Sequence, residues 1–220
     1  DAANASGSPL GTIQGAKVSI GCRHADTIRE LAGTLFWVSQ DRGGGLGVMA
    51  ISSLKPARIS TTAIDRLLQE SDFTTVYSWT ASVLGHQFYV LTLTVSNLTL
   101  AYDLTVKRWY QWTDSSGDYL PILSSSYDAT SQTILQHATN GKVYTFDVTT
   151  YTDDSAAIVF DLVTPNYDGG TRLNKHLQNV DFLADQTPGS ILYVRKSDDD
   201  YQTWSNFREV DLALQRSRLT

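Results

Sequence analysis

The side chains that most often do chemistry are scattered along this 220-residue sequence. Its four histidines lack the HxxxH and HxH spacings that place two imidazoles on one metal ion. Cys22 is the single cysteine, which excludes an internal disulfide and a zinc site built from cysteines. The run Gly43-Gly44-Gly45-Leu46-Gly47 lacks the Lys-Ser/Thr that completes a phosphate loop, and it indicates a hairpin turn. We therefore expect no enzymatic activity, no catalytic residues, no metal site and no cofactor.

The sharpest local pattern is the run Ser197-Asp198-Asp199-Asp200-Tyr201-Gln202-Thr203-Trp204. It resembles the Asp-box, S-x-D-x-G-x-T-W, of sialidases and other β-propellers. Four positions of the box are retained, Ser197, Asp199, Thr203 and Trp204, whereas Tyr201 stands where the box has glycine. In such a turn the aspartate accepts backbone N–H groups and the tryptophan packs beneath it. We therefore expect a structural hairpin end with a buried Trp204 ring.

A second cluster, Trp109-Tyr110-Gln111-Trp112, places three aromatic side chains within four residues. In a strand, alternation puts Trp109 and Gln111 on one face and Tyr110 and Trp112 on the other. One pair is expected in the core, and the other fills the gap between sheets or contributes to a subunit interface, where Trp and Tyr are enriched. Trp109, Tyr110 and Trp112 are therefore candidates for contacts between sheets or between subunits.

The composition indicates that strands and turns position these residues. Hydrophobic residues make up 41% of the chain, enough for a packed core. Of 23 acidic residues only Glu30, Glu70 and Glu209 are glutamate, and aspartate favours turns over helices. The 17 basic residues leave a net charge of −6, which weighs against a basic nucleic-acid-binding surface. Residues 73–102 have no charged side chain, but polar residues interrupt them throughout, so they predict no membrane helix.

The order of elements follows from local patterns. Residues 1–20 are small and polar and predict a linker or flexible arm, followed by a propeller-like domain over residues 21–220. One short helix is expected near residues 62–70, with caps offered by Ser60-Thr61-Thr62 and Asp65 in capping-box position. The expected strands cover residues 35–38, 48–51, 74–79, 87–94, 99–103, 109–112, 122–126, 133–136, 142–147, 158–162, 178–182 and 191–196. The start at Asp1, without a methionine, suggests part of a longer chain.

Short patterns recur at a spacing typical of propeller blades. The segment from Gly33 to Val38 resembles the segment from Gly85 to Val90, 52 residues later. The segment from Gly189 to Val194 follows after 104 more residues, twice that spacing, in the same Gly-x-x-apolar-aromatic-Val pattern. Tyr102-Asp103-Leu104-Thr105 recurs 44 residues later as Phe146-Asp147-Val148-Thr149. The sequence therefore predicts an all-β, β-propeller-like fold, incomplete in this length, with a β-sandwich as the alternative.

Four motifs in this order resemble one phage family. They are residues 36–44, FWVSQDRGG; residues 58–65, RISTTAID; Ala101-Tyr102-Asp103-Leu104 leading to Trp109; and Ser197-Asp198-Asp199 leading to Thr203-Trp204-Ser205. Together, over residues 20–205, they resemble the packaged-DNA stabilisation proteins of short-tailed bacteriophages, the tail-hub or nozzle family. The family's final turn usually has glycine where Tyr201 stands.

The resemblance implies a structural role. Members of this family form ring homo-oligomers, expected to be hexamers, below the portal and its adaptor, and they contact distal tail proteins. They are made in the host cytoplasm and reside in the phage tail of the virion. The ring extends the DNA exit channel and retains packaged DNA, which passes without specific binding and without a membrane. The family brings no enzymatic residues and no cofactor. The alternative is a glycan-active or glycan-binding propeller of the sialidase kind, as the Asp-box-like turn suggests.

Overall fold

The computed structural model describes residues 19–128, 130, 133–150, 152–167, 169–171, 179–184, 188–213 and 217–219. Most of the predicted arm over residues 1–20 lies outside the described residues. By its contacts the chain divides into two units, residues 1–160 and 161–220, and each is described by itself. The assignment of residues 21–220 to one propeller-like domain stays a prediction.

The first unit contains strands, a short 3-10 helix η1 (Ala25–Thr27) and one α-helix, α1 (Thr62–Glu70). Its first eight strands are β1 (Arg29–Leu31), β2 (Thr34–Gln40), β3 (Leu46–Ser52), β4 (Lys55–Arg58), β5 (Val76–Val83), β6 (His86–Leu93), β7 (Leu98–Asp103) and β8 (Arg108–Gln111). They are followed by β9 (Ile122–Tyr127), β10 (Thr133–His137), β11 (Val143–Thr145), β12 (Thr152–Asp153) and β13 (Ala156–Ala157). The prediction of an all-β fold with one short α-helix near residues 62–70 is confirmed.

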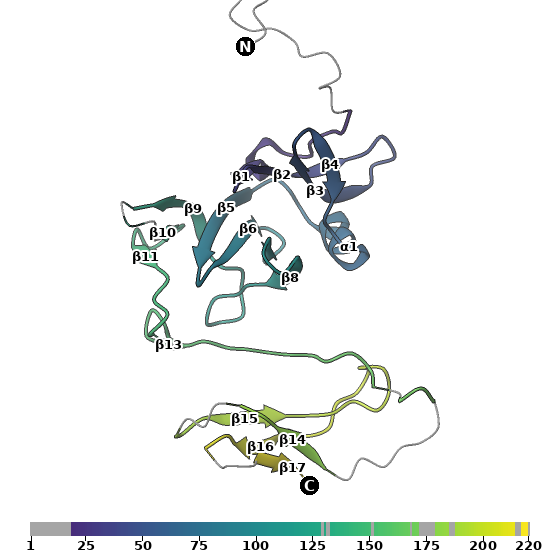
Figure 1. Ribbon diagram of the computed structural model, residues 1–220, viewed down its shortest axis with the longest axis vertical. Helices are drawn as coiled ribbons and strands as arrows, with labels where there is room; N and C mark the ends of the chain where they lie inside the picture. Colours follow the sequence, from purple (N-terminus) through teal and green to yellow (C-terminus); the bar gives the residue numbers. More distant parts are fainter. Residues whose placement is uncertain are drawn as a thin grey trace, which may run out of the picture. The chain divides into compact units, whose positions relative to one another are not determined.

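Two four-stranded antiparallel sheets, β1-β2-β3-β4 and β5-β6-β7-β8, each follow the order of the chain (Figure 1). The first hairpin of each sheet turns at equivalent residues, Ala32-Gly33 and Leu84-Gly85, and all four residues have positive φ. This left-handed conformation at both central positions is that of a tight hairpin turn, and it explains the glycine that opens the repeated pattern. The 52-residue repeat thus marks the same hairpin in two successive sheets.

A third sheet has three strands in the order β11-β10-β9. The 44-residue repeat marks the turn after its last strand. Asp103, the last residue of β7, accepts the backbone N–H of Thr105 at 2.8 Å, and Asp147, shortly after β11, accepts that of Thr149 at 2.9 Å. The strands β12 and β13 that follow pair with one another in a separate hairpin.

The first strands of the three sheets contact one another in chain order. The Arg29 guanidinium of β1 donates to the carbonyl of Ser78 in β5 at 2.7 Å. Two residues further along β5, the backbone N–H of Thr80 donates to the Ser125 hydroxyl of β9 at 3.1 Å. In a β-propeller, successive meanders are arranged around an axis with their first strands adjoining. The contacts of β1, β5 and β9 match this arrangement.

Buried side chains fill the spaces between the sheets. One core cluster joins the first sheet and α1 to the second sheet, with Phe36 and Tyr89 stacked 5.2 Å apart between ring centroids. Burial raises the pKa of Tyr89, whose hydroxyl donates to the carbonyl of Thr27 at 2.6 Å. The second cluster joins the second sheet to the third around Trp79 and Leu135.

The N-terminal cap of α1 lies one residue earlier than the capping-box pattern predicts. Thr61 is the N-cap, and its hydroxyl accepts the backbone N–H of Ile64 at 3.4 Å. Asp65 does not close a capping box with Thr62; its carboxylate pairs with the Arg58 guanidinium at 2.8 Å. The helix buries Ile64 and Leu68.

The second unit contains β14 (Val180–Phe182), β15 (Ile191–Val194), β16 (Arg208–Asp211) and β17 (Ser217–Leu219). They form two two-stranded antiparallel sheets, β14-β17 and β15-β16. The third copy of the glycine pattern, Gly189 to Val194, therefore enters a two-stranded pairing and no four-stranded meander. The prediction that it marks a blade equivalent to the first two is wrong for the described residues.

The predicted strand over residues 158–162 is also wrong, because the structure describes these residues without strand or helix. Its pattern of Ile, Val, Phe and Leu carries a high intrinsic β-propensity. A strand needs a hydrogen-bonded neighbour as well as propensity, and the described residues provide none for this segment.

Candidate functional site

The aromatic cluster of β8 contacts both faces of the second sheet. The Trp109 ring lies 5.0 Å from Tyr102 between centroids, and its indole N–H donates to the carbonyl of Ile59 at 3.0 Å. Ile59 follows β4, so this hydrogen bond links the second sheet to the first. Trp109 therefore contacts the neighbouring sheet rather than solvent.

Trp112 contacts the opposite side, as strand alternation predicts. Its ring lies 4.9 Å from Phe88, 5.9 Å from Trp79 and 6.1 Å from Phe146, measured between centroids. Phe146 follows β11 of the third sheet, so Trp112 links the second and third sheets. Tyr110 between the two tryptophans is 42% exposed.

The family-like motif Arg58–Asp65 forms a compact polar cluster at the start of α1. The Arg58 guanidinium donates to the carbonyl of Leu46 at 2.7 Å as well as pairing with Asp65. The Ser60 hydroxyl accepts the backbone N–H of Val48 at 3.0 Å. These residues hold the helix against β3, and sequence reasoning used the motif without finding this role.

The Asp-box-like turn closes the hairpin of β15 and β16. The Asp199 carboxylate accepts the backbone N–H of Thr203 at 2.8 Å, the Thr203 hydroxyl at 2.5 Å and the Ser197 hydroxyl at 2.8 Å. The Thr203 side chain foremost, then its backbone N–H and Ser197, lower the pKa of Asp199 to about 2. Tyr201, at the position where the box has glycine, has a φ of +67°. This is the left-handed conformation that favours glycine.

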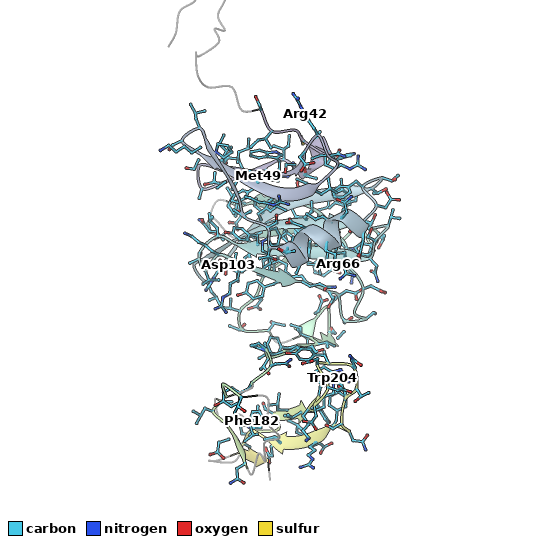
Figure 2. All side chains as sticks on the ribbon, turned by 90° about the vertical axis from the view of Figure 1, so that its right-hand side faces the viewer. Arg42, Met49, Arg66, Asp103, Phe182 and Trp204 are labelled. Atoms are coloured by element: carbon cyan, nitrogen blue, oxygen red, sulfur yellow. The ribbon has the colours of Figure 1, made fainter. Side chains whose placement is uncertain are left out.

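Trp204 differs from the expectation. Its side chain is 37% exposed, so the prediction of a buried ring beneath the turn is wrong (Figure 2). The Arg195 guanidinium lies 4.6 Å from the Trp204 ring centroid and 4.8 Å from that of Phe207. Among the described residues the ring packs against this cation and against the Tyr201 ring, 5.9 Å away between centroids.

A histidine–carboxylate pair lies at one end of the second sheet. His86 Nδ1 is 2.6 Å from the carboxylate of Asp103, whose side chain is buried (Figure 2). Burial alone would raise the pKa of Asp103, but hydrogen bonds from His86 and from the amides of Thr105 and Val106 hold it below its ordinary value. The pair anchors the turn after β7. Sequence reasoning missed it, although the recurrence of this aspartate as Asp147 was a usable signal.

Two shallow hollows occur in the described part of the first unit. One, of about 310 Å³, lies along the first strands and is lined by Glu30, Leu31, Ala32, Thr80, Ser82, Gln87 and Tyr127. The other, of about 210 Å³, lies on the third sheet. Among the described residues no three His, Cys, Asp or Glu side chains lie together as metal ligands. No helix in the described ranges is long and apolar enough to span a membrane.

Comparison with known proteins decides the family. A family model described as bacteriophage P22 Gp10, beta-propeller, matches residues 2–152, more than half of the chain. The chain belongs to this phage stabilisation family. A search of curated proteins finds no match. The propeller prediction is confirmed, and the chain is a phage structural protein with a virion location.

The match to the phage stabilisation family ends at residue 152, before the second unit begins. It includes the two complete sheets, the third sheet and the aromatic cluster of β8. The Asp-box-like turn of this phage structural protein lies beyond it. The resemblance predicted from the four motifs is therefore confirmed for the three motifs that fall within residues 2–152.

Proposed function

We propose that this phage structural protein is a non-enzymatic tail-hub subunit. It forms a ring, a hexamer by family resemblance, below the portal and adaptor and above the distal tail proteins. The ring extends the DNA exit channel and retains the packaged genome. The observation that carries the proposal is the family match over residues 2–152, which coincides with the blade-like sheets.

The physical properties of the chain support this role. Ladders of backbone hydrogen bonds in antiparallel sheets open rarely, which suits a rigid channel wall. The net charge of −6 repels DNA phosphates, so a duplex would slide past such a wall without adhering to it. Such a protein retains DNA by closing the channel together with its neighbours, not by binding the duplex.

Removal of the gene from a phage tests the role. We expect particles without the protein to package DNA and then lose it, measured as genome copies per particle after purification. Complementation with the full protein restores retention. Particles that lack the protein yet keep their genomes and remain infectious would overturn the proposal.

Tyr110 is the candidate for a contact between subunits, since Trp109 and Trp112 pack inside the unit. We expect Tyr110→Ser to weaken assembly of the full protein while leaving its fold intact. Tyr127→Ser is the matched control, because Tyr127 has a similar exposure of 45% on a different sheet. Equal effects of the two substitutions on ring formation would remove Tyr110 from the interface.

A glycan-binding role is the second candidate, and one observation favours it. The hairpin of β15 and β16 exposes the aromatic side chains Tyr193, Trp204 and Phe207 beside Arg195, and exposed aromatic rings stack on sugars. The two hollows of the first unit described above are not lined by arginine, the residue with which sialidases hold a carboxylate. Binding to a glycan array that is lost in Trp204→Ala would support this role, and turnover of sialosides would contradict the non-enzymatic assignment.

A further inference from the structure

The third sheet ends one strand short of its two predecessors. The first two sheets have four strands each, whereas the third has β9, β10 and β11. The Asp103 turn after β7 leads into β8, the fourth strand of its sheet. The matching Asp147 turn after β11 leads into β12, which pairs with β13 instead. Among the described residues, the outer edge of β11 has no strand beside it.

That outer edge also lacks the usual protection. The edge strand β4 reads Lys55-Pro56-Ala57-Arg58, and its proline and charges discourage pairing with another strand. The edge strand β8 begins with Arg108. In contrast, β11 reads Val143-Tyr144-Thr145, without charge or proline. An uncharged open edge is a template for one more strand.

A strand-like segment without a partner occurs in the same chain. Residues 158–163 read Ile-Val-Phe-Asp-Leu-Val, and all six side chains are exposed, Phe160 to 81%. Within the described ranges, none of their backbone groups makes a hydrogen bond to another backbone group. Such β-branched and aromatic runs gain stability when a sheet edge binds them.

We propose that residues 158–163 of a second copy of this chain bind β11 as its missing fourth strand. In antiparallel register, Phe160 lies opposite Val143, and Asp161 then lies opposite Lys142. The two apolar side chains and the two opposite charges form cross-strand pairs of the stabilising kind. The Lys142 ammonium is exposed and already 2.8 Å from Asp154, so a second carboxylate can join it.

The direction of the chain favours a second copy over the segment's own chain. The chain reverses at the Asp147 turn, closed by a hydrogen bond from the N–H of Thr150 to the carbonyl of Asp147, and again in the hairpin of β12 and β13. After two reversals, pairing of the segment with β11 of its own chain would be parallel. Every strand pair in the described residues is antiparallel, a direction that a separate copy can adopt freely.

Sedimentation of the purified full chain at rising concentration tests the proposal. We expect self-association, weakened roughly 10-fold or more by Phe160→Asp, which puts a charge where an aromatic side chain would be buried. Leu84→Asp is the matched control, since Leu84 is 77% exposed in the β5–β6 turn and receives the same charge. A chain that stays monomeric, or equal effects of the two substitutions, would overturn the proposal.

Exchange of the two charges tests the register. Lys142→Asp and Asp161→Lys should each weaken association, and the double variant should restore it. Lys142→Asp also breaks the exposed pair with Asp154, but that loss persists in the double variant and cannot mimic rescue. Failure of the double variant to recover association contradicts the register.

Disulfide trapping distinguishes a second copy from the same chain. In a Cys22→Ser background, a mixture of Val143→Cys and Phe160→Cys chains should form a mixed dimer on oxidation. A mixture of Leu84→Cys and Phe160→Cys chains should not. If the Val143→Cys, Phe160→Cys double variant instead closes only within one chain, the second-copy proposal is wrong.

The strand pairing specifies one contact within the homo-oligomer of the proposed function. It rests on the proposed function only for the existence of that homo-oligomer. Association of the purified chain and genome retention in particles are separate measurements. If the purified chain associates through β11 but particles without the protein keep their genomes, only the tail-hub role is contradicted. Genome loss from particles without the protein, with no association through β11, would contradict the strand pairing only.

Discussion

The strands β6 and β15 follow the same local pattern, a glycine turn before an apolar-aromatic-Val run, but have different surroundings. Gly85 precedes β6, in which Tyr89 is fully buried. Gly189 precedes β15, in which the equivalent Tyr193 is 57% exposed. The strand β6 pairs with both β5 and β7, whereas β15 pairs with β16 alone among the residues that the structure describes. One pattern thus yields a core strand in one place and an exposed strand in the other.

The comparison separates what the pattern encodes from what it does not. The glycine permits a turn, and the alternating apolar and aromatic residues favour an extended strand. Burial requires a sheet on each side, and the neighbouring sheets provide it for β6. Blade-like packing in this chain is therefore a property of consecutive meanders, and a single hairpin with the same pattern does not acquire it.

The largest expected difference in stability is between substitutions at the equivalent residues Tyr89 and Tyr193. Tyr89→Ala should lower the free energy of unfolding of the first unit by about 3–5 kcal/mol, because a buried aromatic ring is lost. The hydrogen bond to Thr27 is lost as well. Tyr193→Ala should change stability by less than about 0.5 kcal/mol, as exposed substitutions usually do. Urea denaturation of both variants measures the difference, and similar losses would show that the two strands are equally supported.

The next effect concerns the two equivalent turns at Asp103 and Asp147. Asp103→Asn should cost about 1–3 kcal/mol, since its carboxylate is buried and bonded to His86 and two amides. Asp147→Asn should cost less, because its side chain is exposed. Thermal unfolding of both variants at neutral pH measures this order. The reverse order would mean that the third sheet depends on its turn more than the second does.

The Asp103 carboxylate also predicts that the stability of the fold depends on pH in the acid range. The folded-state pKa of Asp103 is lowered, so its stabilising effect is complete above its unfolded pKa of about 3.9. It is lost as the pH falls from there through the folded-state pKa. Stability measured against pH should therefore decline less steeply in Asp103→Asn than in the wild type between pH 4 and the folded-state pKa. Parallel curves would exclude this carboxylate as a contributor.

Trp204→Ala should cause a loss of stability of intermediate size. The partly exposed ring and its contact with Arg195 predict a loss of about 1–2 kcal/mol, less than for a buried tryptophan. Arg195→Ala should give part of the same loss, and the two losses should not add fully. A loss near that of Tyr89→Ala would place Trp204 in a core after all.

The smallest effect is expected at Asp199, whose side chain is only partly buried. Its pKa of about 2 in the folded chain means that the turn gains stability above pH 4 and loses it as the pH falls through 2. Titration of the carboxyl carbon by NMR checks the value directly. Thr203→Val removes the first hydrogen-bond donor and should raise the pKa of Asp199, whereas Thr149→Val should leave it unchanged.

Much of the local structure was predictable from the sequence. Ala32-Gly33 and Leu84-Gly85 mark hairpins because glycine adopts positive φ readily, and Thr61 and the apolar residues after it mark the helix. Alternation at Trp109 and Trp112 placed them on opposite faces of the sheet. The 44- and 52-residue spacings indicated repeated units, and equivalent turns occur at the repeated positions. Each of these inferences depends on residues close together in the chain.

Only the tertiary structure decided which segments are buried and which strands find partners. In the described part of the chain, residues 158–162 have the side chains of a strand but no neighbouring strand, and Trp204 has the motif of a buried ring but is 37% exposed. The Trp109–Ile59 hydrogen bond likewise joins elements that the sequence does not place together. Local patterns set backbone conformation through sterics and hydrogen bonds within a turn. Burial and pairing depend on distant segments, whose approach is settled by packing of the whole unit.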